Sequence, residues 1–132
     1  MATIANTPAE RCALAVKAAT DALEAARLSA ASAANHAVAA ALAAAEAGHR
    51  VTDAQRDCAD EADKHASEAA RYCRRTRIGY HLTQGAAEAG DAFTAERETS
   101  TACRAAQKAA VAEAAARFCA RQARKLSEGG GA

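Results

Sequence analysis

Alanine dominates this chain and limits what it can fold into. Of the 132 residues, 45 are alanine, whereas leucine, isoleucine, valine and phenylalanine together supply only 14. Alanine has the highest intrinsic helix propensity, and most of the remaining residue types also tolerate helix well. Strands need β-branched and aromatic runs with a period of two, which the sequence lacks. We therefore expect an all-α fold whose core is built largely from methyl groups.

Length and charge favour one folded domain. The 17 basic and 16 acidic residues leave a net charge of +1, so the strong charge imbalance typical of disordered chains is missing. A chain of 132 residues is long enough for one core but short for two. We expect a single helical-bundle domain over residues 1–126 and a flexible glycine-rich tail at 127–132.

Capping signals divide this domain into three long helices. The segment Thr7 to Glu10 has the form of a capping box with proline at the first helical position, and Gly48 is a natural C-terminal cap. Val51 to Gln55 repeats the N-terminal pattern. Glycines at 79, 85 and 90 predict that the second helix ends between residues 78 and 84. The expected helices span about 8–47, 53–82 and 91–126.

Short connections between long helices predict an antiparallel, up-down-up bundle of three alanine-rich helices. Reflection about the two connections places residue j of the second helix level with residue roughly 176 minus j of the third. An alternative is a four-helix bundle in which the first helix breaks near Ser29 to Ser32, although no glycine or proline stands there.

Helical periodicity predicts which faces are buried. The second helix gathers its core candidates on one face: Cys58, Ala62, Ala66, Ala69, Cys73 and Tyr80. Its opposite face is charged: Asp53, Asp57, Asp60, Lys64, Arg71 and Arg75. On the third helix, the large apolar residues predict the core face: Phe93, Val111, Phe118 and Leu126. Glu113, Arg117 and Arg124 lie on the opposite side of that helix and are expected to face water.

The first helix contains an unusual uncharged segment from Leu28 to Ala45, in which His36 is the one side chain able to carry charge. A helix that is apolar all round is usually buried all round, and two helices of the same chain can cover only part of it. We therefore expect a second copy, or a helix of another protein, to cover the rest. The predicted contact residues are Leu28, Ala34, Ala37, Val38, Ala41 and Leu42. The competing interpretation is that exposed alanine is only a favourable helix former.

The five cysteines stand at positions 12, 58, 73, 103 and 119. The reflection makes Cys58 level with Cys119 and Cys73 level with Cys103, so both are possible thiol pairs. Because Cys103 and Cys119 lie about 160° apart around one helix, both cannot point at the second helix, and at most one intrachain disulfide is expected. In a reducing compartment the five thiols stay free.

Metal binding is the first alternative function. His65 follows Glu61 by one helical turn, and the reflection brings His36 of the first helix to the same level. These three residues form the predicted ligand set of a Zn(II) or Cu(I) site. The competing interpretation is one surface carboxylate and two histidines satisfied by neighbours or water.

Nucleic-acid binding is the second alternative function. The stretch from residue 71 to 81 carries two tyrosines, a histidine and four arginines: Arg71, Arg74, Arg75 and Arg77. Such a composition can bind phosphates and stack on bases. Basic residues are also favoured at helix C-terminal ends by the macrodipole, and the near-zero net charge makes nucleic acid an unlikely partner.

Catalysis is not expected. The sequence has no phosphate-binding loop, no nucleophile elbow, and no Ser, His and Asp set that a bundle would bring together. It predicts no cofactor, no secretory signal and no membrane role. We expect a cytoplasmic, non-catalytic structural or interaction protein of coiled-coil type that self-associates or binds a partner helix.

Overall fold

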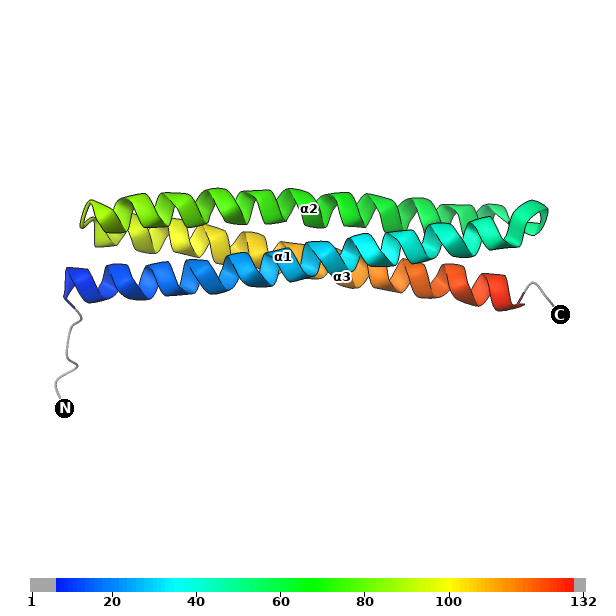
Figure 1. Ribbon diagram of the computed structural model, residues 1–132, viewed down its shortest axis with the longest axis horizontal. Helices are drawn as coiled ribbons and strands as arrows, with labels where there is room; N and C mark the ends of the chain where they lie inside the picture. The colour runs from blue at the N-terminus through cyan, green and yellow to red at the C-terminus, as the bar shows by residue number, and fades with distance from the viewer. Residues whose placement is uncertain (1–6, 130–132) are drawn as a thin grey trace, which may run out of the picture.

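In the computed structural model, which describes residues 7–129, three long helices lie side by side along a rod (Figure 1). They are α1 (Pro8–Ala47), α2 (Asp53–Glu88) and α3 (Ala92–Gly129), and the short 3₁₀ turn η1 (Gly48–Arg50) follows α1. The chain runs along the rod, returns in α2 and runs forward again in α3 (Figure 1). The predicted all-α, up-down-up three-helix bundle is confirmed. Because α1 is continuous through Ser29 and Ser32, the four-helix alternative is wrong.

Side-chain caps begin each helix. Thr7 Oγ1 accepts a hydrogen bond from the Glu10 N–H, and Thr52 Oγ1 accepts one from the Gln55 N–H, both at 3.1 Å. At the start of α3, Asp91 Oδ1 accepts a hydrogen bond from the Thr94 N–H at 3.1 Å. Hydrogen bonds from the side chain and the backbone of Thr94 lower the pKa of the Asp91 carboxyl. The predicted starts of α1 and α2 are therefore confirmed.

The end of α2 differs from the prediction. The helix continues to Glu88 instead of ending between residues 78 and 84, and the chain turns at Gly90, whose φ is 74°. Gly79 lies inside the helix and is buried against α3. A Cβ atom at this position would come within 2.9 Å of Ala102 Cβ. This glycine serves the close approach of α2 and α3, not helix termination. The longer α2 also shifts the register, so that Thr83 contacts Thr99 where the reflection placed residue 93.

The C-terminal boundary was also wrong in part. Helix α3 extends to Gly129, so residues 127–129 are helical and do not belong to a flexible tail. Residues 130–132 of the predicted tail lie outside the described part of the chain.

Alanine fills the core from end to end. The fully buried side chains include alanines from all three helices: Ala19, Ala26, Ala33, Ala40, Ala62, Ala69, Ala95, Ala102, Ala109, Ala116 and Ala123. On the predicted core face of α2, Ala62, Ala69 and Cys73 are buried and the other three members are half-buried, whereas the acidic and basic residues opposite them are exposed, as predicted. The largest fully buried side chains are polar: Gln55, Thr76 and Thr83.

Buried polar groups join the helices at both ends of the rod. Near the α1–α2 turn, Gln55 Nε2 donates to the carbonyl oxygens of Ala43 on α1 and Ala123 on α3, each at 3.2 Å. Near the other end, Thr99 Oγ1 donates to the Ala15 carbonyl at 2.9 Å and lies 3.2 Å from Thr83 Oγ1. An unpaired buried polar group would cost about 1–3 kcal/mol, so these bonds favour one alignment of the three helices.

The predicted core face of α3 is wrong. Phe93, Val111 and Phe118 are 70%, 72% and 62% exposed, and Leu126 is also exposed. Glu113, expected to face water, is half-buried and accepts a hydrogen bond from Ser32 at 2.9 Å. Closely spaced helices leave room for methyl groups between them but not for phenyl rings, so α3 turns its alanines inward. Among residues 7–129, Leu23 is the one leucine, isoleucine, valine or phenylalanine that is buried.

Candidate interaction surface

The outer surface carries the large apolar side chains that the core excludes. Ten of them are exposed: Leu14, Leu28, Val38, Leu42, Ile78, Leu82, Phe93, Val111, Phe118 and Leu126. Three of the ten fall within the uncharged stretch of α1 from residue 28 to residue 45. This stretch therefore combines exposed apolar groups with an absence of charge.

One row of α1 residues faces directly away from the bundle. These residues, which we call the α1 seam, are spaced alternately by three and four positions: Leu28, Ala31, Asn35, Val38, Leu42 and Ala45. All six are exposed, with Leu28 at 66%, whereas Ala33 and Ala40 on the opposite side of the helix are completely buried. Spacing of this kind is the a and d pattern of a heptad repeat, which forms a helix-pairing surface. The seam spans eighteen residues, about 27 Å of helix.

The structure places the six predicted contact residues as follows. Leu28, Val38 and Leu42 lie in the seam, and Ala34 and Ala41 are exposed beside it. Ala37 is buried in a cluster with residues of α2 and α3, so its assignment to an external contact is wrong. The error arose because a segment without charge shows no polar side from which to infer an orientation. The seam residues Ala31, Asn35 and Ala45 were missed, although the three-four spacing identifies them.

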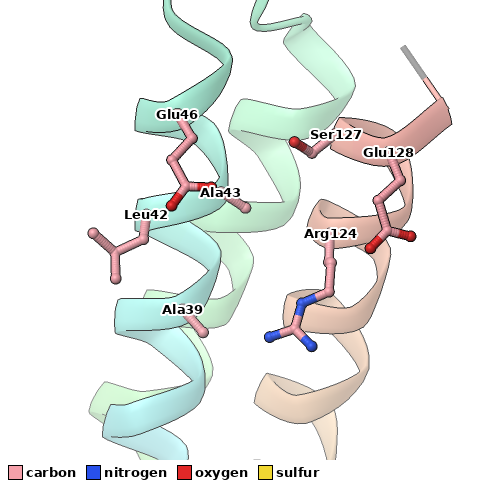
Figure 2. A pocket seen from close by; sticks show the side chains of 7 residues that line it. All are labelled: Ala39, Leu42, Ala43, Glu46, Arg124, Ser127 and Glu128. Atoms are coloured by element: carbon pink, nitrogen blue, oxygen red, sulfur yellow. The ribbon is translucent and has the colours of Figure 1, made fainter. Parts of the chain in front are cut away.

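A groove lies between α1 and α3 next to the last turn of the seam (Figure 2). It measures about 360 Å³ and is lined by Ala39, Leu42, Ala43, Glu46, Arg124, Ser127 and Glu128. Figure 2 shows the Leu42 side chain pointing outward from α1, whereas the Arg124 guanidinium extends from α3 toward α1. The groove therefore forms a charged border beside the apolar seam.

All five cysteines are free. Cys58 and Cys119 pack against one core cluster, and Cys73 and Cys103 belong to another farther along the rod, so each predicted pair shares a layer of the bundle. Burial raises the pKa of the Cys119 thiol, and neighbouring Cys58 and Glu61 raise it further. A raised pKa disfavours the thiolate, which is the nucleophilic and metal-binding form.

The structure does not bring the three predicted metal ligands together. His36 Nε2 lies 3.5 Å from Glu113 Oε1 on α3. His65 lies between two carboxylates of its own helix, 3.7 Å from Glu61 and 3.5 Å from Glu68. Residues 7–129 hold no group of three or more His, Cys, Asp or Glu side chains arranged to bind a metal ion. Each histidine instead has a carboxylate neighbour.

The predicted basic cluster surrounds a tyrosine ring. The charged groups of Arg71, Arg75 and Lys108 lie 5.3, 5.5 and 5.7 Å from the centroid of the Tyr72 ring, within the range of cation–π interactions. Beside them, a groove of about 240 Å³ between α2 and α3 also includes Arg104. Lys108 and Arg104 were missed because they come from another helix, and only the bundle register places them beside α2.

The predicted arginines Arg71, Arg74, Arg75 and Arg77 are all exposed. Over the described range none of these four, nor Arg104 and Lys108, takes part in an ion pair. The cluster is therefore a patch of unneutralised positive charge.

By length and composition alone, the helical stretch Pro8–Arg50 is apolar enough to cross a membrane. Only 11% of its most apolar window of eighteen residues is buried in the bundle. The core helices of soluble proteins and signal sequences near an N-terminus pass the same test, so it does not distinguish them from a membrane span.

No family of known proteins, no curated protein and no solved structure that we compared with this chain matches it.

Proposed function

We propose that this protein is a non-catalytic, cytoplasmic helical protein that self-associates through the α1 seam. The observation that carries the proposal is a row of six exposed, uncharged residues pointing away from the core of the bundle. Contiguous exposed apolar surface on a soluble protein commonly marks an interaction site. Burial of such surface contributes about 25 cal/mol per Å², which favours association.

Two further features support the seam over the other exposed apolar residues. Ile78 and Leu82 on α2 stand next to the arginine cluster, and Phe118 on α3 lies between Arg117 and Arg121 along the chain. Burial of a charged group in a contact costs free energy unless the charge finds a partner. The seam lies in a stretch of eighteen residues in which His36 is the one side chain able to carry charge. In a reducing compartment such as the cytoplasm, the five cysteines would stay as thiols.

The test places glutamate at each of two exposed valines, one in the seam and one on α3. Val38 in the seam is 58% exposed and Val111 on α3 is 72% exposed, so glutamate at either position leaves the monomer fold intact. We expect Val38→Glu to convert a dimer or larger assembly into monomers, because two carboxylates would be buried in the contact. Val111→Glu should keep the native mass. The mass is measured by sedimentation equilibrium over a concentration series on the reduced protein. A monomeric native chain, or equal loss of assembly in both variants, would contradict the proposal.

A second candidate function rests on the cations around Tyr72. We propose that this patch binds a nucleic acid through its phosphates, because unpaired arginines and an aromatic ring can bind phosphate and stack on bases. The triple variant Arg71→Ala, Arg75→Ala and Lys108→Ala, which removes the cations around the ring, should lose salt-sensitive retention on RNA or DNA. The matched control removes three exposed cations elsewhere: Arg121, Arg124 and Lys125. Equal retention of the two triple variants would exclude this role for the patch.

A further inference from the structure

The α1 seam pairs a leucine with an alanine at each end and holds two residues of middle size, Asn35 and Val38, at its centre. One set of heptad positions holds Leu28, Asn35 and Leu42, and the other holds Ala31, Val38 and Ala45. A helix that packs on the seam therefore meets Leu28 and then Ala31 near one end, and Leu42 and then Ala45 near the other. The size of each side chain sets how close the partner helix can come at that level.

Parallel pairing of two copies fits this arrangement poorly. In a parallel pair each seam residue faces its own counterpart, so Leu28 meets Leu28 and Ala31 meets Ala31. The two-leucine layers would hold the helix axes apart, and the two-alanine layers would then be left unfilled. Underfilled layers lose dispersion contacts and leave cavities.

Antiparallel pairing removes the mismatch. With residue i opposite residue 73 minus i, Leu28 faces Ala45 of the second copy, Ala31 faces Leu42, and Asn35 faces Val38. The leucine layers then each combine one larger and one smaller side chain, and the central layers combine Asn35 with Val38 of middle size, so the interaxial distance can stay constant along the seam. Alternation of large and small residues across facing positions is the arrangement that fills such layers.

Charges beyond the seam select the same direction. The seam rows continue toward the N-terminus with Glu24 and Asp21, both exposed. Parallel pairing would place each of these carboxylates against its own copy. Antiparallel pairing places Glu24 level with residue 49 of the second copy, beside the turn that follows α1 and carries His49 and Arg50. Like charges are separated, and opposite charges come together.

Asn35 gives the antiparallel pair a defined centre. In this register the two Asn35 side chains lie one layer apart on either side of the two-fold axis, about 4.5 Å along the helix direction. Their amides can hydrogen-bond to each other across the contact. A single asparagine in an apolar heptad seam is a known means of specifying register.

We propose that two copies of this chain pair their α1 seams antiparallel, with Leu28 of each copy against Ala45 of the other and the two-fold axis between Asn35 and Val38. The inference rests on the self-association proposed above and specifies its partner, direction and register. Because the contact is closed by a two-fold axis, the product is a dimer of bundles and not a fibre.

The test uses disulfide cross-linking in a background in which all five native cysteines are replaced by alanine. Two variants are made, Ala31→Cys and Leu42→Cys, and one of them carries an affinity tag so that mixed dimers are recognised by mass. In the proposed register, residue 31 faces residue 42 of the other copy, within the roughly 7 Å limit for a disulfide. Residue 31 lies about 16 Å along the axis from residue 31 of the other copy.

We expect cross-links when the two variants are mixed and none when either is oxidised alone. A mixture of Leu42→Cys with Ala114→Cys, an exposed alanine on α3, measures collisional cross-linking.

The possible outcomes distinguish failure of the proposed register from failure of self-association. A dimer in which Ala31→Cys cross-links alone is parallel, which overturns the register and leaves self-association standing. A dimer in which no combination exceeds the collisional control overturns the register, and Val38→Glu then decides between another register on the seam and a contact elsewhere on the bundle. A monomer at all concentrations overturns both proposals, and its co-sedimentation with anionic lipid vesicles would identify a membrane as the occupant of the seam.

A second measurement covers the case in which the cysteine-free background does not fold, and it keeps the native cysteines. Leu28→Ala and Ala45→Leu each spoil two layers of the antiparallel homodimer, but their mixture restores one larger and one smaller residue in both. We expect each single variant to dimerise more weakly than the native chain and the mixture to form heterodimers preferentially. A parallel heterodimer would gain the same match at levels 28 and 45, so this measurement tests the size matching and the cross-links test the direction. A random mixture of species would overturn the register.

Discussion

The inner and outer faces of α1 carry almost no charge between residues 28 and 45, yet they differ in side-chain size. The inner face presents Ala33, Ala37 and Ala40 to the other helices, and the outer face presents Leu28, Val38 and Leu42 to solvent. Most bundles place the larger residues inside. Here the spacing of the three helices is set by methyl groups, so a larger side chain has no place between them.

This size difference has an energetic consequence. A buried alanine removes less apolar surface from water than a buried leucine, so an alanine core supplies less hydrophobic stabilisation per residue. Dispersion contacts along three helices of 36 to 40 residues supply the rest of the free energy that stabilises the fold. A chain built in this way gains stability when its exposed leucines are covered, because association stabilises the folded state by mass action.

The largest expected effect comes from one substitution made on each face. Ala37→Glu places a carboxylate in the core between three helices, and we expect it to lower the free energy of unfolding by about 3–5 kcal/mol. Ala41→Glu, one turn later on the exposed side, should change it by no more than about 0.5 kcal/mol in the monomer. Urea unfolding followed by circular dichroism at 222 nm measures both values. Similar losses of unfolding free energy in the two variants would show that residues 37 and 41 are equally buried in solution, which would contradict the structure.

The next largest effect compares the buried leucine with an exposed one. Leu23 is 5% exposed and Leu28 is 66% exposed on the same helix. Leu23→Ala should cost about 2–5 kcal/mol of unfolding free energy, because it removes core contacts and leaves a cavity. Leu28→Ala should leave the monomer within about 0.5 kcal/mol of the native value and weaken the assembly. Unfolding at low protein concentration isolates the monomer, and sedimentation of the same samples reports the assembly. A large loss of monomer stability from Leu28→Ala would contradict the placement of this residue outside the core.

How much of this arrangement could be predicted from the sequence depended on the kind of signal. Thr7, Pro8, Gly48 and Thr52 act locally, through hydrogen bonds and backbone angles within a few residues, so the limits of α1 and the start of α2 were predicted correctly. The charged face of α2 could also be predicted, because its polar and apolar residues alternate with the helical period.

The errors arose where packing between helices reverses a local preference. Gly79 is a helix breaker by propensity, but here it sits where Ala102 of α3 comes close. Phe93 and Phe118 are core residues by hydrophobicity, but a core spaced for alanine cannot hold them. Hydrophobic patterning assumes that the most apolar face is buried, and that assumption holds only when the helices are far enough apart to accept large side chains. Within the predicted contact segment, Ala37 was misplaced because no charge defined an outer side.

The smallest effect, and the one that tests helix spacing most directly, compares two glycines of α2. Gly79→Ala adds a methyl group within 2.9 Å of Ala102 Cβ, and neither side chain can move aside by rotation, so the helices must separate. We expect it to lower the free energy of unfolding by about 1–3 kcal/mol. Gly85→Ala meets no atom within 4 Å and should raise it by about 0.4–1 kcal/mol, since alanine restricts the unfolded chain and favours helix. The opposite signs make the pair informative, because helix propensity alone predicts a gain at both positions. A gain from Gly79→Ala would mean that α2 and α3 are farther apart than methyl-to-methyl contact. The interior would then have room for the large side chains that lie outside it.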